Sequence, residues 1–104
     1  ASRDIIGKYS DKLCCTHLND NMGQTTSSIT WLDDSHLLPF DGVGNWDGIA
    51  ARLKKANYTG DLTFELTVLN KPERNTHDIY AGLDFEAYSA LALERAKKFK
   101  SMMQ

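Results

Sequence analysis

Four side chains of the kinds that bind metals or move protons recur in two short apolar segments and in the loop between them. His17 ends a short apolar run, and Glu65 lies near the end of a second run in which apolar and polar residues alternate. Asp34 and His36 lie in the long connection between the runs. Because side chains two apart in an extended segment point the same way, this pair can present a carboxylate and an imidazole together. Such groups suit Zn, Mn, Co or Fe, so the set points to a divalent-metal site.

Each of these residues also has an ordinary structural explanation. His17 can be a satisfied polar residue at the end of a strand, and Asp34 with His36 can cap a loop. Glu65 lies among apolar residues, so it needs a partner that a salt bridge would supply. No compact local metal motif is present, and the metal site is favoured only by the joint placement of all four residues. His77 has no neighbour in the sequence that argues for a role, so we expect it at the surface or in loop packing.

Predicted strands alternate with predicted helices along the chain. Residues 12–18 are a short apolar run, which is typical of a strand buried on both faces. Residues 61–69 alternate, with Leu62, Phe64 and Leu66 on one face. Helices are expected over 84–102 and from Asn45 or Asp47 through about Asn57. This order predicts an α/β fold in which helices cover a parallel sheet.

Two strands cannot make a sheet that buries both of its faces, because apolar strands need neighbours on both sides. Each predicted strand is also followed by an unusually long loop, and long loops in compact domains are usually functional. In parallel α/β folds, sites collect at the carboxyl ends of the strands. We therefore expect the chain to be part of a larger α/β unit, or to pair with another copy.

Composition and charge restrict the possible partners. The chain has 104 residues, about one domain, of which 41% are hydrophobic and 25% charged. A net charge of −2 and a pI near 5.9 give no global attraction to nucleic acid or to an acidic membrane. Cys14 and Cys15 are adjacent in an apolar run, and we expect them to be small buried residues of a reduced, cytoplasmic protein.

The stretches "CCTHLNDN" and "DDSHLLPFDGVGNWDGIAARLKKANYTGDLTFEL" carry an ordered series of motifs. A strand ends in H-x-x-D, and a loop with D-x-H and a Pro/Gly-rich turn leads to a helix. A Y-x-G turn and a last strand ending in Glu follow. This series resembles the C-terminal part of the xylose isomerase-like TIM-barrel superfamily, the sugar phosphate isomerase and epimerase group that also includes endonuclease-IV-type apurinic nucleases. The resemblance covers about residues 5–100.

The resemblance implies roles for particular residues. His17 and Glu65 match metal ligands at the ends of the seventh and eighth barrel strands, and Glu65 is also the candidate catalytic acid/base. Asp34 and His36 match a pair that binds substrate or a second metal. A separate set matches the pocket wall: Leu38, Pro39 and Phe40, the last of which stands where many relatives have glycine.

The resemblance also implies an incomplete barrel. The other metal ligands of the family come from earlier strands, and residues 1–11 cannot supply them. We therefore expect residues 1–104 to be the C-terminal portion of a single (β/α)8 TIM-barrel domain. Its raw sheet edges would be covered by the remainder of the barrel or by other copies of the chain in an oligomer.

The function implied is a divalent-metal-dependent isomerase or epimerase of a sugar or sugar phosphate, working through an enediolate with Mn, Zn, Co or Mg. Alone, the chain is expected to be inactive, because two or three ligands cannot fix the metal. The nearest alternative is an endonuclease-IV-type apurinic endonuclease, which the acidic charge disfavours. A dehydratase or lyase acting on a cyclic polyol is a further alternative, and a non-catalytic self-associating module is another. We expect neither nucleic acid nor membrane as a partner.

Overall fold

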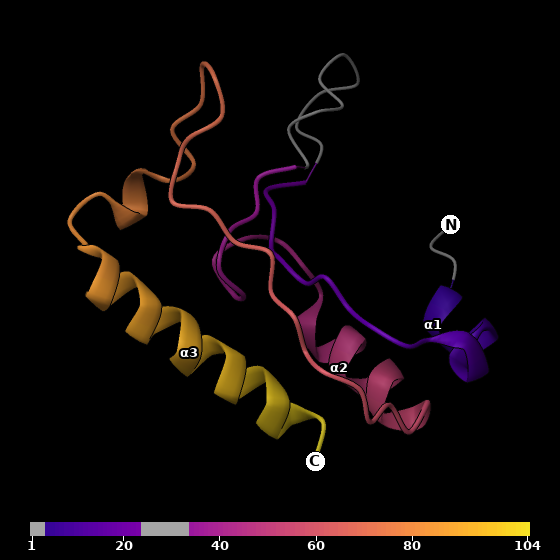
Figure 1. Cartoon of the computed structure of the whole chain (residues 1–104). Coiled ribbons are helices and arrows are strands. Elements are labelled where there is room, and N and C mark those ends of the chain that lie inside the picture. Colours follow the sequence, from indigo (N-terminus) through magenta and orange to yellow (C-terminus); the bar gives the residue numbers. More distant parts are fainter. Residues whose placement is uncertain (1–3, 24–33) are drawn as a thin grey trace.

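A computed structural model describes residues 4–23 and 34–104, and the ordered elements in them are helical. A short first helix and a 3-10 turn come first, and two longer helices lie further along the chain (Figure 1). In chain order the elements are α1 (Ile5–Lys8), η1 (Ser10–Lys12), α2 (Trp46–Lys55), η3 (Asp78–Tyr80) and α3 (Phe85–Met102).

Capping residues fix the ends of the two long helices. The Asn45 side chain accepts a hydrogen bond from the Gly48 N–H at the start of α2, and Asp84 does the same for Ala87 at the start of α3. After α2, Asn57 has a φ of 54°, and the N–H of Tyr58 reaches back to the Leu53 carbonyl, which satisfies the end of the helix. Both helices predicted from the sequence are confirmed.

The predicted sheet is absent from residues 4–23 and 34–104, which contain only isolated bridges. One parallel bridge joins Leu18 to Phe64, and one antiparallel bridge joins Asp20 to Leu37. The prediction of an α/β fold, and of a C-terminal TIM-barrel fragment with parallel strands alternating with helices, is therefore wrong. Residues 12–18 and 61–69 are extended in places but are not strands.

The reason is that each extended segment has too few neighbours to build a ladder. The Leu18 N–H donates to the Thr63 carbonyl at 2.8 Å, and the Glu65 N–H donates to the Leu18 carbonyl at 2.9 Å. One step earlier, the Thr63 N–H donates to the Thr16 hydroxyl instead of to a backbone carbonyl. An isolated parallel pair is weak, and side-chain hydrogen bonds of this kind compete with the ladder.

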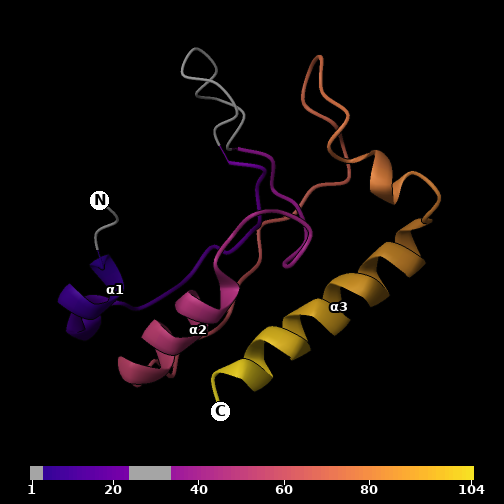
Figure 2. The same ribbon diagram turned by 180° about the vertical axis from the view of Figure 1, so that it is seen from behind.

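Two apolar clusters take the place of a sheet core. The larger lies between α2 and α3, where the Trp46 and Phe99 rings meet edge to face at 5.2 Å between centroids. The second cluster joins the loop after the first extended segment to η3 and α3 through Leu37, Leu38, Tyr80 and Tyr88. In both views the loop that follows residue 69 projects away from α2 and α3 (Figures 1 and 2).

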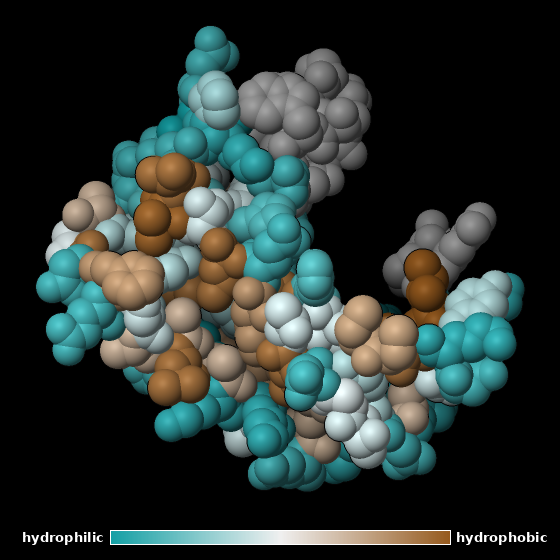
Figure 3. Space-filling model, viewed as in Figure 1, coloured by the Kyte–Doolittle hydropathy of each residue, from teal (hydrophilic) through white to brown (hydrophobic). Residues whose placement is uncertain are grey.

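These clusters leave much apolar surface uncovered. The chain extends over 39 × 36 × 19 Å, and its thinness limits what can be buried. Leu69 is 73% exposed, and brown apolar surface lies in patches among polar residues on the face in Figure 3. Cys14 and Cys15 are exposed free thiols, so the expectation that they are buried is wrong. No helix in the described part of the chain is long and apolar enough to cross a membrane.

The contact between α2 and α3 gives the first prediction. Phe99 is fully buried, whereas Phe85, on the same helix, is 86% exposed. Phe99→Ala is expected to lower the free energy of unfolding by about 3–5 kcal/mol, because it leaves a cavity against Trp46. The matched change Phe85→Ala should alter it by less than about 0.5 kcal/mol. Urea unfolding followed by tryptophan fluorescence measures both, and equal losses would contradict the assigned core.

Candidate functional site

The structure brings together the four residues that the sequence singled out. The Glu65 carboxylate lies centrally, with its Oε2 atom 3.7 Å from His17 Nδ1 and 3.9 Å from His36 Nδ1. His36 Nε2 contacts the Asp34 carboxylate. These residues come from the two extended segments and from the loop between them, so the bridge between Leu18 and Phe64 sets their spacing. We call this group the His–carboxylate cluster.

Both ring nitrogens of His36 are used within the protein. Nδ1 lies 3.0 Å from the backbone carbonyl oxygen of Glu65, and Nε2 faces the Asp34 carboxylate. Both ring nitrogens are therefore engaged by oxygen atoms of the protein. The φ of His36, 56°, lies in the left-handed region, so the surrounding contacts hold this residue in a strained conformation.

Asp34 is likewise engaged on both oxygens. His36 meets one oxygen, and the Lys71 ammonium lies 3.2 Å from the other. The hydrogen bond from His36, followed by that from Lys71, holds the pKa of the Asp34 carboxyl below its usual range. The sequence analysis missed Lys71, which lies in the second long loop and carries no motif.

The side chains of His17, Glu65 and Asp34 are 67%, 56% and 64% accessible, but both oxygens of Asp34 already have partners within the protein. A cavity of about 370 Å³ opens beside Glu65 and His36. The rest of its lining comes from the segment after Glu65: Leu66, Thr67, Leu69, Asn70, Lys71 and Pro72. Of the four cluster residues, His17 and Glu65 are therefore the two with groups left for a ligand.

The cluster does not by itself fit a divalent metal. Nitrogen and oxygen ligands of one such ion bond at about 2.0–2.2 Å with free lone pairs. Both ring nitrogens of His36 already face oxygen atoms of the protein, which leaves His17 and Glu65. Within residues 4–23 and 34–104, no group of three or more His, Cys, Asp or Glu side chains is placed to hold a metal ion. The roles of His17 and Glu65 as metal ligands stay predictions.

The residues proposed for the pocket wall do not line the cavity beside Glu65. Leu38 and Pro39 are fully buried. Phe40 is half-buried and has a φ of 77°, a conformation that glycine adopts easily. Its ring packs 5.6 Å from that of Trp46, and the Lys98 ammonium lies 4.1 Å from its centre. These contacts hold a phenylalanine at a position where the resembled family often has glycine.

Asp20, the aspartate of the H-x-x-D motif, to which the sequence analysis gave no role, positions the whole loop. Its side chain is fully buried and accepts hydrogen bonds of 2.8–3.1 Å. The donors are the backbone N–H groups of Asn21, Phe40, Gly42 and Gly44 and the indole N–H of Trp46. A Cβ at Gly42 would lie 2.1 Å from the Asn21 carbonyl oxygen, so the close approach requires glycine there. Asp20 and Leu37 also exchange both backbone hydrogen bonds.

A second set of hydrogen bonds attaches the same loop to η3 and α3. The Asp41 carboxylate accepts hydrogen bonds from the Tyr80 hydroxyl at 2.8 Å and from Arg95 at 2.7 Å, and Arg95 also donates to the Pro39 carbonyl. Burial, together with the Asp41 charge, holds the pKa of Tyr80 well above its usual value. His77, expected at the surface or in loop packing, is 2% exposed beside Tyr80, and burial lowers its pKa.

Comparison with known proteins gives one relative of undetermined role. The chain is 38% identical over 61 residues to the uncharacterized protein y4fM of Sinorhizobium fredii, a match that covers 59% of this chain. The chain spans only 17% of the length of that relative. No family model matches the chain. No solved structure matches it either.

The Asp20 hydrogen bonds predict a large effect of a small change. Asp20→Asn is expected to lower the free energy of unfolding by about 3 kcal/mol, because an amide nitrogen cannot accept from the backbone donors it would face. The exposed matched change Asp11→Asn should leave stability within about 0.5 kcal/mol of the parent. Urea unfolding measures both. A loss for Asp20→Asn no larger than that for Asp11→Asn would show that the buried carboxylate does not hold the loop.

The contacts of Asp34 predict how its titration responds to substitution. His36→Ala should raise the pKa of Asp34 toward its ordinary value, and Lys71→Met should raise it by less, in the order of the two hydrogen bonds that lower it. Lys97→Met, a lysine remote from the cluster, should leave it unchanged. Carboxyl ¹³C shifts recorded across acidic pH give the three values. An Asp34 pKa that is insensitive to both His36 and Lys71 would rule out the contacts described.

Proposed function

We propose that the His–carboxylate cluster is one part of the substrate site of a divalent-metal-dependent isomerase or epimerase that acts on a sugar. The observation that carries this proposal is the convergence of His17 and His36 on Glu65, with Asp34 held against His36. The rest of the site would come from polypeptide outside the 104 residues, which is consistent with a relative far longer than this chain. We also propose a cytoplasmic location, which the sequence analysis expected from the two adjacent cysteines.

The four residues of the cluster form two pairs with different proposed roles, Glu65 with His17 and Asp34 with His36. Glu65 is exposed and beside the cavity, so its carboxylate is the group that moves a proton between neighbouring carbons of a bound sugar. His17 lies beside it, with its Nδ1 atom 3.7 Å from the carboxylate, and contributes its imidazole to the same part of the site. Asp34 and His36 are occupied with each other, so their role is to orient Glu65 through the contact of His36 with the Glu65 carbonyl.

A divalent ion remains part of the proposal only with ligands from outside the chain. Such an ion would polarise the sugar carbonyl, with Glu65 and His17 as the ligands this chain contributes. The same incompleteness implies that the isolated chain does not turn over sugar. The apurinic-nuclease alternative is less well supported, because Lys71 and His36 already occupy Asp34 and the net charge is −2.

Sugar binding by the isolated chain tests this function without requiring turnover. A ketohexose titrated into ¹⁵N-labelled chain should shift the signals of Glu65 and of residues 66–71 that line the cavity. Glu65→Gln should weaken that binding about tenfold, because charged hydrogen bonds to hydroxyls are lost. Glu73→Gln, an exposed glutamate in the following loop, is the matched control and should have no effect.

Two results would count against the proposal. One is a ketohexose titration that shifts no signal at the cluster. The other is equal weakening by Glu65→Gln and Glu73→Gln, which would assign the binding to overall charge. Circular dichroism of each variant establishes that the comparison is between folded chains.

A further inference from the structure

One edge of the extended segment that carries Glu65 has no backbone partner. In extended chain, backbone groups of successive residues point to opposite sides. Thr63 and Glu65 point toward Leu18 and form the bridge. The backbone N–H and C=O groups of Leu62, Phe64 and Leu66 point the other way, and they make no hydrogen bond within the described residues. This edge is therefore open for pairing.

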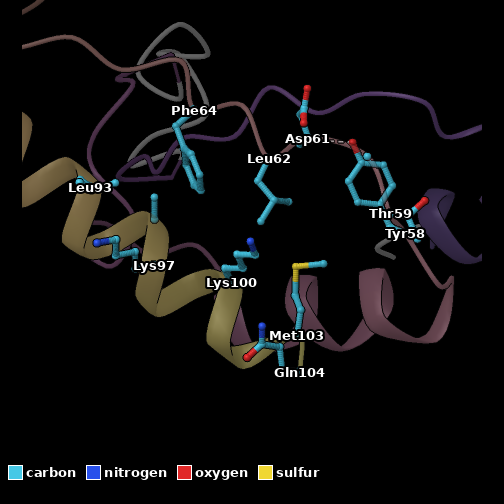
Figure 4. A pocket seen from close by; sticks show the side chains of 12 residues that line it. Tyr58, Thr59, Asp61, Leu62, Phe64, Leu93, Lys97, Lys100, Met103 and Gln104 are labelled. Carbon is cyan, nitrogen blue, oxygen red and sulfur yellow. Dashed lines mark hydrogen bonds between the residues drawn. The ribbon is translucent and has the colours of Figure 1, made fainter.

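An apolar groove of about 610 Å³ lies next to this edge, between the segment and the C-terminal half of α3. Figure 4 shows Leu62 and Phe64 directed from the segment toward the helix, with Leu93 and Met103 on the α3 side. Leu62 and Phe64 are only half-buried, and Leu93 is 55% exposed. Apolar side chains of an added strand would enter this groove while its backbone paired with the edge.

The charge on the helix wall selects the kind of strand. Lys97 and Lys100 stand on α3 along the groove (Figure 4). Both lysines are exposed, and neither forms an ion pair with a residue in the described ranges. The carboxylate lining the groove, that of Asp61, belongs to the opposite wall. An incoming segment with acidic side chains would therefore complement the helix wall.

We propose that this edge and groove bind an extended, acidic and apolar segment of a different polypeptide, which adds as a strand alongside Leu62–Leu66. Main-chain hydrogen bonds to the open edge would give the affinity, and the apolar groove and the two lysines the selectivity. This inference does not depend on the proposed sugar chemistry.

A second copy of the chain fits the surface less well. Two copies paired antiparallel along this edge would be related by a two-fold axis perpendicular to the paired segments. That symmetry keeps both α3 helices on the same face, where Lys97 and Lys100 of the two copies would share one groove. Like charges placed together oppose association, whereas an acidic strand removes the conflict.

Short blocked peptides serve as the probes. One peptide carries valine and glutamate in turn at every second position with threonine between them, so that both kinds of side chain face α3. A second has lysine in place of glutamate, and a third is the glutamate peptide with N-methylated backbone on its pairing side. Fluorescence anisotropy with the 104-residue chain should show the glutamate peptide binding about tenfold more tightly than the lysine peptide, and no binding of the methylated form. The double variant Lys97→Glu/Lys100→Glu should reverse the preference. The matched variant Lys8→Glu/Lys12→Glu, on α1 and η1, should retain it.

Each of the following results would overturn the proposal. Absence of binding by the glutamate peptide, or equal affinity for both charged peptides, removes the basis for an acidic strand. Unchanged binding of the methylated peptide excludes pairing at the edge. Sedimentation velocity that shows a dimer, abolished by Leu62→Glu in the groove, would instead assign the surface to a second copy. Circular dichroism of both double variants checks that they remain folded.

Discussion

The arrangement of this chain depends on one buried carboxylate. The Asp20 carboxylate accepts hydrogen bonds from five donors. Most are backbone N–H groups of the loop before α2, and one is the indole N–H of Trp46, the first residue of that helix. A carboxylate removed from water is costly unless its oxygens are fully hydrogen-bonded, so the loop must close around it. The paired backbone of Asp20 and Leu37 then places His36 beside Glu65.

A second set of contacts, made by Asp41, also holds the loop in place without a sheet. The Asp41 carboxylate accepts hydrogen bonds from Tyr80 and Arg95, so the loop is also attached to η3 and α3. With both sets of contacts in place, the His–carboxylate cluster can be ordered although Leu18 and Phe64 form only one bridge. Polar groups of the interior, rather than a strand ladder, therefore position the candidate site.

Local signals in the sequence predicted the helices and the cluster, but not the contacts between distant residues. The caps Asn45 and Asp84 are readable from residue type, and the spacing of Asp34 and His36 suggested that they act together. The alternation of residues 61–69 predicted a strand wrongly, because pairing needs neighbours that no local pattern supplies. Asp20 appeared in the sequence only as the aspartate of H-x-x-D, and its structural role was missed for a related reason. Its partners are backbone N–H groups about twenty residues away, and these leave no trace in residue type.

The contacts within the His–carboxylate cluster also decide which of its residues remain available to a ligand. Asp34, His36 and Lys71 satisfy one another, so they are committed to structure and cannot also coordinate a ligand without breaking those contacts. The reactive capacity that remains is that of Glu65 with His17, one carboxylate and one imidazole. The proton transfer proposed above would need the hydroxyls of a sugar held on more than one side, and the segment bearing Glu65 is open along its other edge. A polypeptide that pairs with that edge would stand next to Glu65, where it could add the missing groups.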